Sequence, residues 1–503
     1  IPVPKAQDIQ LIKPRIVPPR SLRKTFSTDH LERLNHSYGK SFPDVARAML
    51  GLFPNPPDLI AFPHNQEDVI NILDWSDQNN IAVIPYGGGS SVCGGVETDV
   101  GDSYSGVISL DLRNLNQVLE IDQESRAARI QAGIFGPALE AELKQSNLTL
   151  RHFPQSFEHS TLGGWIATRS GGHFATLYTH IDDFVESTTM ITPKGVVESR
   201  RLPGSGAGPS PDRMVIGSEG ILGVITEAWM RLQERPKFRA SCPVLFDDYS
   251  KALKATQLIS QSALFPANCR LLDANEALFN GAGDGSKHLL ILSFESADHE
   301  MNIWLERALE IASDVGGQFE LPRKKESDAH KTGASGTWRN SFIRAPYYRE
   351  ASVRRGIIQD TFETSITWDK GFNFIESLKE KASKAIKEIS GKNSTVTCRL
   401  THTYPDGLAP YFSYTAYATP STMIDVWREI KLVTNEMCIE EGGTVTHHHA
   451  VGRDHRIKGY DLQRSEGFKN MLSAAKKEVD PSSILNPGVL IDPDNKKIKN
   501  WMN

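Results

Sequence analysis

The sequence contains no long apolar run and no secretory leader. No segment reaches the about 18 uncharged apolar residues that a membrane-spanning helix needs. The N-terminus lacks the basic, apolar and small-residue regions of a signal peptide. We therefore expect a soluble protein that is not secreted. Because the chain begins with Ile1 instead of Met, a targeting signal further upstream stays outside this expectation.

Cysteine is scarce and positive charge is not in excess. The five cysteines, at 93, 242, 269, 398 and 438, show no C-x-x-C spacing, which excludes a disulfide framework and a zinc-finger pattern. With 56 basic and 61 acidic residues the formal net charge is -5. A net negative charge gives no general electrostatic reason to bind nucleic acid, so we predict no nucleic-acid partner.

The length of 503 residues predicts more than one domain. A single hydrophobic core stops growing at roughly 250 to 300 residues. Changes in composition and periodicity divide the chain into an extended N-terminal arm at 1–37, a glycine-rich domain of two lobes at 38–236, a second domain at 237–455, and a segment at 456–503 that returns to the first domain.

Hydrophobic periodicity predicts alternating helices and strands, and hence an α+β fold. We expect helices at 67–79, 136–145, 249–262, 299–315, 421–441 and 462–479. We expect strands at 81–85, 106–112, 118–122, 127–132, 186–191 and 195–198.

Three glycine-rich turns stand out in the first half of the chain. Gly87, Gly88 and Gly89 follow a predicted strand, where glycines let successive N–H groups approach a diphosphate, and Ser90 and Ser91 add hydroxyl donors. The pattern is neither the Rossmann nor the P-loop motif. Alone, a triple glycine is as often a plain turn. Further glycine-rich turns follow at 163–172 and 217–223, and three of them in order strengthen the indication of a diphosphate site.

The segments 85–91, 160–165 and 217–226 resemble the FAD motifs of the vanillyl-alcohol-oxidase superfamily. That resemblance implies a two-lobed FAD-binding domain and an α+β cap, or substrate, domain with an antiparallel sheet. From about residue 30 to 490 the chain is most similar to the alkyldihydroxyacetonephosphate synthases. The segments that carry this similarity are 269–273, 363–365, 368–369, 401–404, 411–412 and 446–449.

The resemblance implies that FAD is the cofactor and assigns residues to it. The turn at 87–91 would cradle the diphosphate, and 161–172 and 217–226 would line the adenosine and the flavin. We expect the FAD contacts to be Pro85, Gly87, Gly88, Gly89, Ser90, Ser91, Ser160, Thr161, Gly163, Gly164, Thr168, Ser170, Gly171, His173, Glu219, Gly220, Gly223, Val224 and Ile225. The histidine nearest the first turn in the sequence is His64, so we predict non-covalent FAD.

The resemblance also implies roles in the reaction. Arg270 would bind a substrate phosphate, Tyr411 would be the acid/base group, and His447, His448 and His449 would exchange protons near the flavin. Alternatives stay open: Arg270 as a structural ion pair, Tyr411 as a bonded core hydroxyl, and the histidines as metal ligands. In a strand only His447 and His449 would share a face, so we predict no metal site.

For function, the resemblance implies an FAD-dependent transferase. It would exchange the acyl group of acyl-dihydroxyacetone phosphate for a fatty alcohol through a flavin N5 adduct, as in ether-lipid synthesis, without net oxidation. An FAD-dependent oxidase or dehydrogenase of an alcohol or 2-hydroxy acid is the first alternative, and a non-catalytic FAD-binding protein is the second. Lipid substrates lead us to expect peripheral membrane contact. We also expect a homodimer, and the resemblance to this family implies a peroxisomal location.

Overall fold

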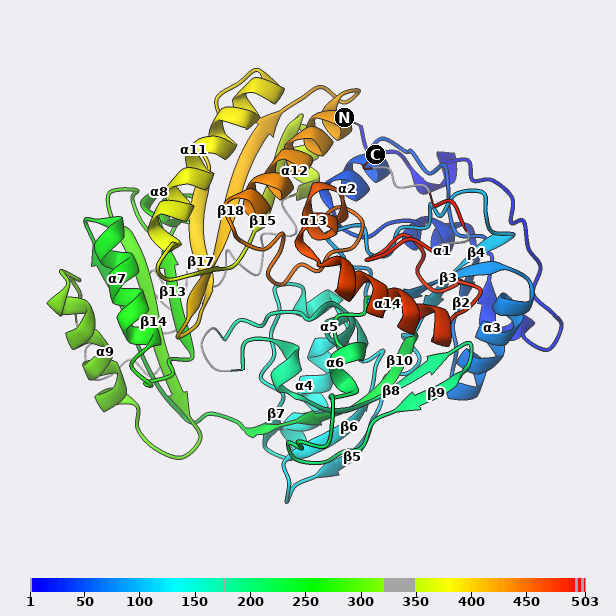
Figure 1. Cartoon of the computed structure of the whole chain (residues 1–503), viewed down its shortest axis with the longest axis horizontal. Helices are drawn as coiled ribbons and strands as arrows, with labels where there is room; N and C mark the ends of the chain where they lie inside the picture. The colour runs from blue at the N-terminus through cyan, green and yellow to red at the C-terminus, as the bar shows by residue number, and fades with distance from the viewer. Residues whose placement is uncertain (1, 175–177, 321–348, 494–495, 499–501, 503) are drawn as a thin grey trace.

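The computed structural model describes residues 2–174, 178–320, 349–493, 496–498 and 502. Parts of the predicted arm, FAD-binding domain, cap domain and C-terminal segment, at 1, 175–177, 321–348, 494–495, 499–501 and 503, lie outside the described residues. Figure 1 shows the strands up to β10 on one side of the molecule and the strands of the cap on the other.

The first lobe contains a mixed sheet in the order β1-β2-β4-β3, with β2 and β3 parallel to β4. Its strands are β1 (Phe26–Ser27), β2 (Leu59–Ala61), β3 (Ile81–Tyr86) and β4 (Gly106–Asp111). Because β4 is covered on both faces, its six residues are all buried. The helices of this lobe are η1 (Ala6–Asp8), η2 (Arg23–Thr25), α1 (His30–Asn35), α2 (Phe42–Met49) and α3 (Gln66–Gln78).

The predicted helix at 67–79 and strand at 81–85 are confirmed by α3 and β3. The Asn65 side chain accepts a hydrogen bond from the Asp68 N–H and so caps α3. The predicted arm contains short helices and is tied to this lobe, since the Arg15 guanidinium pairs with the buried Asp58 carboxylate at 2.7 Å.

The second lobe contains an antiparallel sheet in the order β5-β6-β10-β8-β9. Its strands are β5 (Val118–Asp122), β6 (Ala127–Gln131), β8 (Val185–Thr192), β9 (Gly195–Glu198) and β10 (Val224–Arg231), and the short β7 (Leu148–Thr149) pairs with β11 (Gln233–Glu234). Its helices are α4 (Gly136–Gln145), η3 (Phe157–His159), α5 (Leu162–Thr168), η4 (Ile181–Asp183) and α6 (Asp212–Val215). The predicted helix at 136–145 is confirmed.

The cap contains an antiparallel sheet in the order β12-β14-β13-β17-β18-β15, with β16 also on β18, which confirms the predicted cap sheet. Its strands are β12 (Phe238–Phe246), β13 (Asn268–Leu272), β14 (His288–Ser296), β15 (Ile357–Glu363), β16 (Ile366–Thr367), β17 (Thr397–Thr403) and β18 (Gly407–Tyr417). Its helices are α7 (Tyr249–Ser260), α8 (Ala274–Phe279), α9 (Asn302–Asp314), α11 (Gly371–Ser390) and α12 (Met423–Glu440).

The strands of the cap sheet alternate between a hydrophobic core and a cavity. In β17, Cys398 and Leu400 belong to the core beneath the helices, whereas Thr397, Arg399 and Thr401 line a cavity on the opposite face. This is the period of two that a strand imposes on its side chains. The same alternation holds in the other central strands, with Cys269, Leu271, Leu292 and Phe412 on the core side and Asn268, Arg270, Ser293 and Tyr411 on the cavity side.

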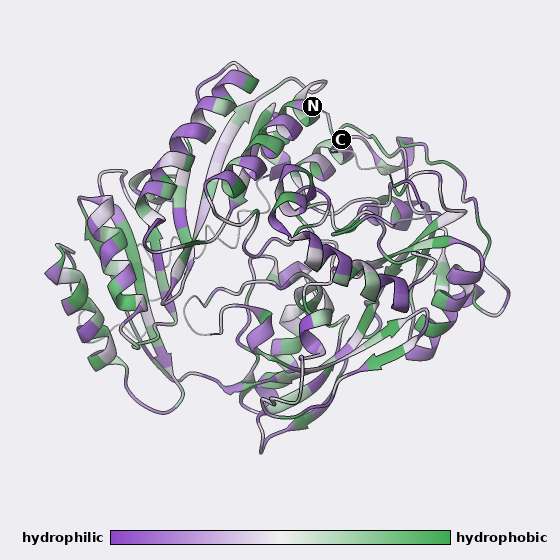
Figure 2. Ribbon diagram, in the orientation of Figure 1, coloured by the Kyte–Doolittle hydropathy of each residue, from purple (hydrophilic) through white to green (hydrophobic). Residues whose placement is uncertain are grey.

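The C-terminal segment packs on the FAD-binding lobes. After η5 (Arg456–Tyr460), α13 (Asp461–Gln463) and α14 (Glu466–Val479), the chain returns to β3, where the Val83 N–H donates to the Ile484 carbonyl at 2.8 Å. Ile484 and Leu485 join the core of those lobes. Figure 2 shows hydrophobic residues along many strands and mixed faces on the covering helices. No described helix is both long and apolar enough to span a bilayer.

Candidate active site

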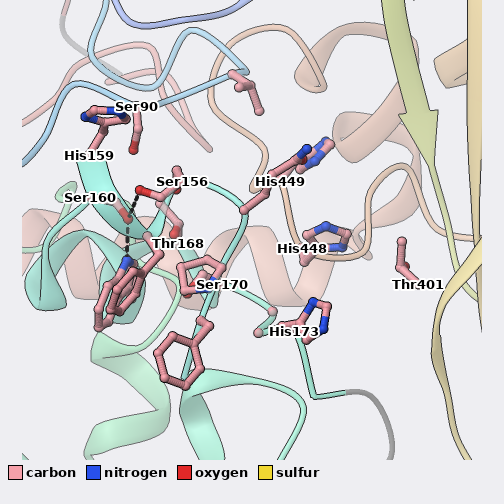
Figure 3. Close-up of a pocket in the computed structure, with 18 of the residues that line it drawn as sticks. Ser90, Ser156, His159, Ser160, Thr168, Ser170, His173, Thr401, His448 and His449 are labelled. Atoms are coloured by element: carbon pink, nitrogen blue, oxygen red, sulfur yellow. Dashed lines mark hydrogen bonds between the residues drawn. The ribbon is translucent and has the colours of Figure 1, made fainter. Parts of the chain in front are cut away.

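A cavity of about 1280 Å³ lies between the FAD-binding lobes and the cavity face of the cap sheet. Every residue that the sequence assigned to FAD lines it, as do Arg270, Tyr411, His448 and His449. His447 is not among the lining residues. Figure 3 shows Ser90, Ser160 and Thr168 on one side of this cavity and His448, His449 and Thr401 on the other. The fold therefore brings predicted residues from three distant parts of the chain to one space.

The turn after β3 is held closely against the segment before α5. An ideal Cβ on Gly88 would lie 1.8 Å from the His159 carbonyl oxygen, so only glycine fits there. Gly89 has φ +66°. The backbone N–H groups of residues 88–91 donate no hydrogen bond to any residue that the structure describes. Four successive donors are therefore available to an anion at this wall.

The segment at 160–171 forms the floor of the cavity. The Trp165 indole N–H donates to Ser160 Oγ at 2.7 Å, and Ser160 Oγ donates to the Ser156 carbonyl at 2.8 Å (Figure 3). Thr161 caps α5 through the Gly164 N–H. Gly171 approaches the cap, since its ideal Cβ would lie 3.0 Å from the His402 ring. The floor thus reaches from the first turn to the histidines.

The third turn connects the lobes to the segment after the histidine triplet. The buried Glu219 carboxylate accepts hydrogen bonds from the backbone N–H groups of Val451, at 2.8 Å, and Gly452, at 2.7 Å. Burial raises the pKa of Glu219 to about 7, against the opposing effect of these two N–H groups. This carboxylate therefore links predicted cofactor and catalytic segments.

Arg270 lies on β13 and is 1 % exposed. Its Nη2 donates to the His173 carbonyl at 2.7 Å, and the Asn268 side chain contacts His173 Nε2 at 3.0 Å. Burial and, secondarily, the charge of Arg399 lower the pKa of Arg270 to about 9. A phosphate at this point in the cavity would relieve both effects.

Tyr411 lies on β18 directly opposite Arg399 of β17. The Arg399 guanidinium carbon is 4.0 Å from the centroid of the Tyr411 ring, and Arg399 Nη1 lies 2.6 Å from Glu276 Oε1. Burial raises the pKa of Tyr411, although Arg399 lowers it in part. The ring also faces His449, with centroids 5.4 Å apart.

The histidine triplet lies outside the strands, so the alternation that would pair His447 with His449 does not apply. His447 points away from the cavity toward the second lobe, where its Nε2 lies 2.7 Å from the Tyr404 hydroxyl and 3.3 Å from His180 Nε2. Burial lowers the pKa of His447 well below its usual value, and it lowers that of His449 to about 4. Both imidazoles are therefore neutral near pH 7.

Two groups of side chains near the triplet have their donor atoms within 4.8 Å of one another and could hold a metal ion. They are His402, His447 and His448, and Glu363, His448 and His449. The sequence predicted no metal site here, and that statement stays a prediction. His402 is partly engaged already, since its Nε2 lies 2.9 Å from the Gly172 carbonyl oxygen.

Comparison with known proteins places these features in a family. Residues 57–199 match the FAD binding domain family, and residues 235–490 match the C-terminal domain of FAD linked oxidases. An alkyldihydroxyacetonephosphate synthase of Dictyostelium discoideum is 32% identical over 92% of this chain and 78% of its own length. The chain belongs to the alkyldihydroxyacetonephosphate synthase family. The synthase of Trypanosoma brucei brucei is 27% identical over 93% of this chain and 80% of its own.

A solved alkyldihydroxyacetonephosphate synthase structure superposes with a TM-score of 0.79, at 27% identity, over 97% of this chain and 88% of that one. The predicted fold, family and cofactor are thereby confirmed: the chain is an FAD-dependent enzyme. The cavity fits FAD because it offers four available N–H donors beside β3. In space His159 lies beside Ser90 of this turn, a neighbour that sequence distance did not reveal, and non-covalent binding stays a prediction (Figure 3).

In this synthase-family site, sequence reasoning assigned no role to several lining side chains and to one buried carboxylate behind them. Arg399, Glu276, Lys431 and His402 line the cavity, and Glu363 contacts the triplet. For Arg399 a signal existed in the segment 397–401, where Thr, Arg and Thr alternate with Cys and Leu as in a strand with one polar face. For Glu363 no local pattern indicated the contact, because its partners lie more than 80 residues away.

Proposed function

We propose that this enzyme exchanges the acyl group of an acyl-dihydroxyacetone phosphate for a fatty alcohol, giving an ether and a free fatty acid. The single observation that carries the proposal is the cavity, in which the predicted FAD wall faces Arg270, Tyr411 and two histidines. The bond between C1 and the acyl oxygen breaks, the carboxylate leaves, and the alcohol oxygen forms a new bond to C1. The alcohol proton is released, so no net oxidation occurs.

Each chemical requirement has a residue in this cavity. Arg270 binds the phosphate as a buried cation, which a charge-assisted hydrogen bond favours. Tyr411 and the two histidines that line the cavity take a proton from C1 and later return one, since an unprotonated imidazole carries a lone pair that can accept a proton. When bound, FAD supplies an electron sink at the reacting carbon.

The decisive experiment uses purified holoenzyme with palmitoyl-dihydroxyacetone phosphate under anaerobic conditions, with and without hexadecanol. We expect hexadecanol-dependent release of palmitate and no lasting loss of flavin absorbance. The match of residues 235–490 to FAD linked oxidases favours one alternative, oxidation of an alcohol or 2-hydroxy acid. Lasting flavin reduction by such a compound, with no response to the acyl phosphate, would establish that alternative.

A variant comparison tests the role of Tyr411. We expect Tyr411→Phe to lower kcat by about 10²-fold to 10⁴-fold, the usual contribution of a general acid or base, with FAD content unchanged. Tyr417→Phe is the matched control, because Tyr417 lies on the same strand but is 40% exposed and does not line the cavity. Equal kcat for both variants would remove Tyr411 from the mechanism.

We also propose that the mouth of the cavity contacts a membrane surface. Phe279 on α8 lines the cavity yet is 68% exposed, and its neighbour Leu278 is 48% exposed, as expected where a lipid chain enters. Phe279→Ser should weaken sedimentation with phosphatidylcholine vesicles, while Ile303→Ser, an equally exposed apolar change on α9, should not. Equal binding by both variants would count against this contact. The homodimer remains a prediction for sedimentation analysis.

A further inference from the structure

One buried carboxylate organises the histidine triplet. Glu363 ends β15 and is 1 % exposed. Its Oε1 accepts hydrogen bonds from the backbone N–H groups of His447 at 3.2 Å, His448 at 2.8 Å and His449 at 2.7 Å. The Thr446 hydroxyl donates to the same oxygen at 2.8 Å. A single oxygen atom therefore fixes the backbone course of the whole triplet.

The second oxygen of Glu363 makes a different contact. Oε2 lies 2.6 Å from Nδ1 of His448, whereas the nearest contact of His449 is 3.7 Å, to Oε1. Burial would raise the pKa of Glu363, but His448, His449 and their hydrogen bonds outweigh burial and hold it well below its usual value. The carboxylate is thus ionised, and its buried Oε2 has no hydrogen-bond donor other than His448 among the described residues. Nδ1 of His448 also lies 3.1 Å from Nδ1 of His447, but the shorter distance and the negative charge of Oε2 favour a proton on His448 Nδ1 directed at the carboxylate.

The other nitrogen of His448 is available to the cavity. His448 lines the cavity, and its ring is tilted by 25° to that of Tyr411 with centroids 6.1 Å apart. Its Nε2 makes no hydrogen bond to any described residue, since its printed ring contact is through Nδ1. An imidazole that donates through Nδ1 keeps its lone pair on Nε2, so a carboxylate on one side makes the other side a proton acceptor. His447, by contrast, is bonded to Tyr404 behind the cavity wall.

We propose that Glu363 is a positioning residue that fixes His448 as the proton-accepting histidine of the triplet, with Nε2 directed at the substrate. This inference rests on the proposed exchange reaction and makes it more specific, because it selects one histidine of three. The carboxylate sets the tautomer and orientation of the ring and stabilises the imidazolium that forms when His448 takes a proton from C1. The proton later returns from His448 to the product.

Glu363→Gln separates this role from a merely structural one. The glutamine oxygen can still accept from the three backbone N–H groups and from Thr446, so the course of the triplet is kept. The amide NH₂ at the second position donates instead of accepting, and it therefore forces His448 into the opposite tautomer, with a proton on Nε2. Glu306→Gln on the exposed face of α9 is the matched control.

The test measures FAD content, kcat and KM for palmitoyl-dihydroxyacetone phosphate with hexadecanol, using holoenzyme of Glu363→Gln, His448→Gln and the double variant. We expect normal FAD content, KM within about threefold, and kcat lowered about 10²-fold to 10⁴-fold in each single variant. The double variant should be no slower than the slower single, because residues acting as one unit are not additive. A kcat within threefold of wild type for Glu363→Gln, or effects that multiply, would overturn the proposal.

A second comparison stays valid if Glu363→Gln fails to fold. In the presence of Glu363, His448→Gln should lose more kcat than His447→Gln or His449→Gln, and a larger loss in either of these would overturn the proposal.

Wild-type holoenzyme separates failure of the proposed exchange reaction from failure of the proposed role of Glu363. If it releases no palmitate, the exchange reaction fails, and the same variants are then compared by the rate of flavin reduction with the active alcohol or hydroxy acid. If it releases palmitate and Glu363→Gln does so equally well, only the role of Glu363 fails.

Discussion

Adding one methyl group at Gly88 should weaken FAD binding through a clash within the protein itself. A Cβ at this position would lie 1.8 Å from the His159 carbonyl oxygen and 3.0 Å from the Ser160 Cα. An ordinary contact between carbon and oxygen is about 3.3 Å, so the two segments must separate by about 1.5 Å. These segments carry the predicted diphosphate turn and the floor of the cavity, so the separation moves two FAD walls apart.

The cost follows from overpacking. Inserting a methyl group into a tight contact costs about 1 to 3 kcal/mol, and both neighbours here are backbone, which cannot rotate away. If the FAD-bound form bears about 2 kcal/mol of this cost more than the apoprotein, FAD binds roughly 30-fold more weakly. Each 1.4 kcal/mol changes the dissociation constant about tenfold. We expect Gly88→Ala to be purified with little flavin and to melt at a lower temperature.

The assay titrates apoprotein with FAD and follows flavin fluorescence, alongside thermal unfolding. Gly204→Ala is the matched control, because its Cβ would have no neighbour within 4 Å. There the loss of backbone freedom in the unfolded chain predicts unchanged or slightly higher stability. A Gly88→Ala protein that binds FAD as tightly as Gly204→Ala and melts at the same temperature would refute the reasoning.

Three further predictions concern charge. Arg270→Met should raise the KM for the phosphate substrate roughly 10-fold to 100-fold, because a hydrogen bond to a charged group contributes about 1.5 to 3 kcal/mol. The exposed Arg307→Met is the control and should leave this KM unchanged. Burial raises the pKa of Glu219 from 4.5 to about 7, so its contribution to the free energy of unfolding is fully present below pH 4.5 and is lost as pH rises through 7. Between pH 5 and 8, urea unfolding should therefore show wild type losing about 2.5 kcal/mol of its free energy of unfolding relative to Glu219→Gln. Parallel pH profiles of the two proteins would contradict this. Asp58→Ala should lower the free energy of unfolding by about 1 to 3 kcal/mol and speed proteolysis near Arg15. The substitution removes the hydrogen-bond partner of the Arg15 guanidinium and of the Val107 N–H. A proteolysis pattern like that of wild type would argue against an N-terminal arm held by Asp58.

Local sequence determined the elements and the cofactor turns. The apolar spacing of 67–79 and the run at 81–85 define α3 and β3, because helix and strand periodicities are properties of the local backbone. The glycines at 87–89 indicated a close backbone approach, and the structure supplies the neighbour, His159, that requires it. Resemblance added Arg270, Tyr411 and the triplet, whose roles stay predictions.

What the tertiary structure decided is how residues far apart in the chain act on one another. The sequence could not show that His447 lies behind the cavity wall, that His159 lies beside the first turn, or that Glu363 holds the triplet, which begins 84 residues later. Each of these facts depends on strand pairing and on the packing of the cap against the lobes. Such contacts are set by long-range burial and hydrogen bonding, for which the amino-acid order leaves no periodic local pattern.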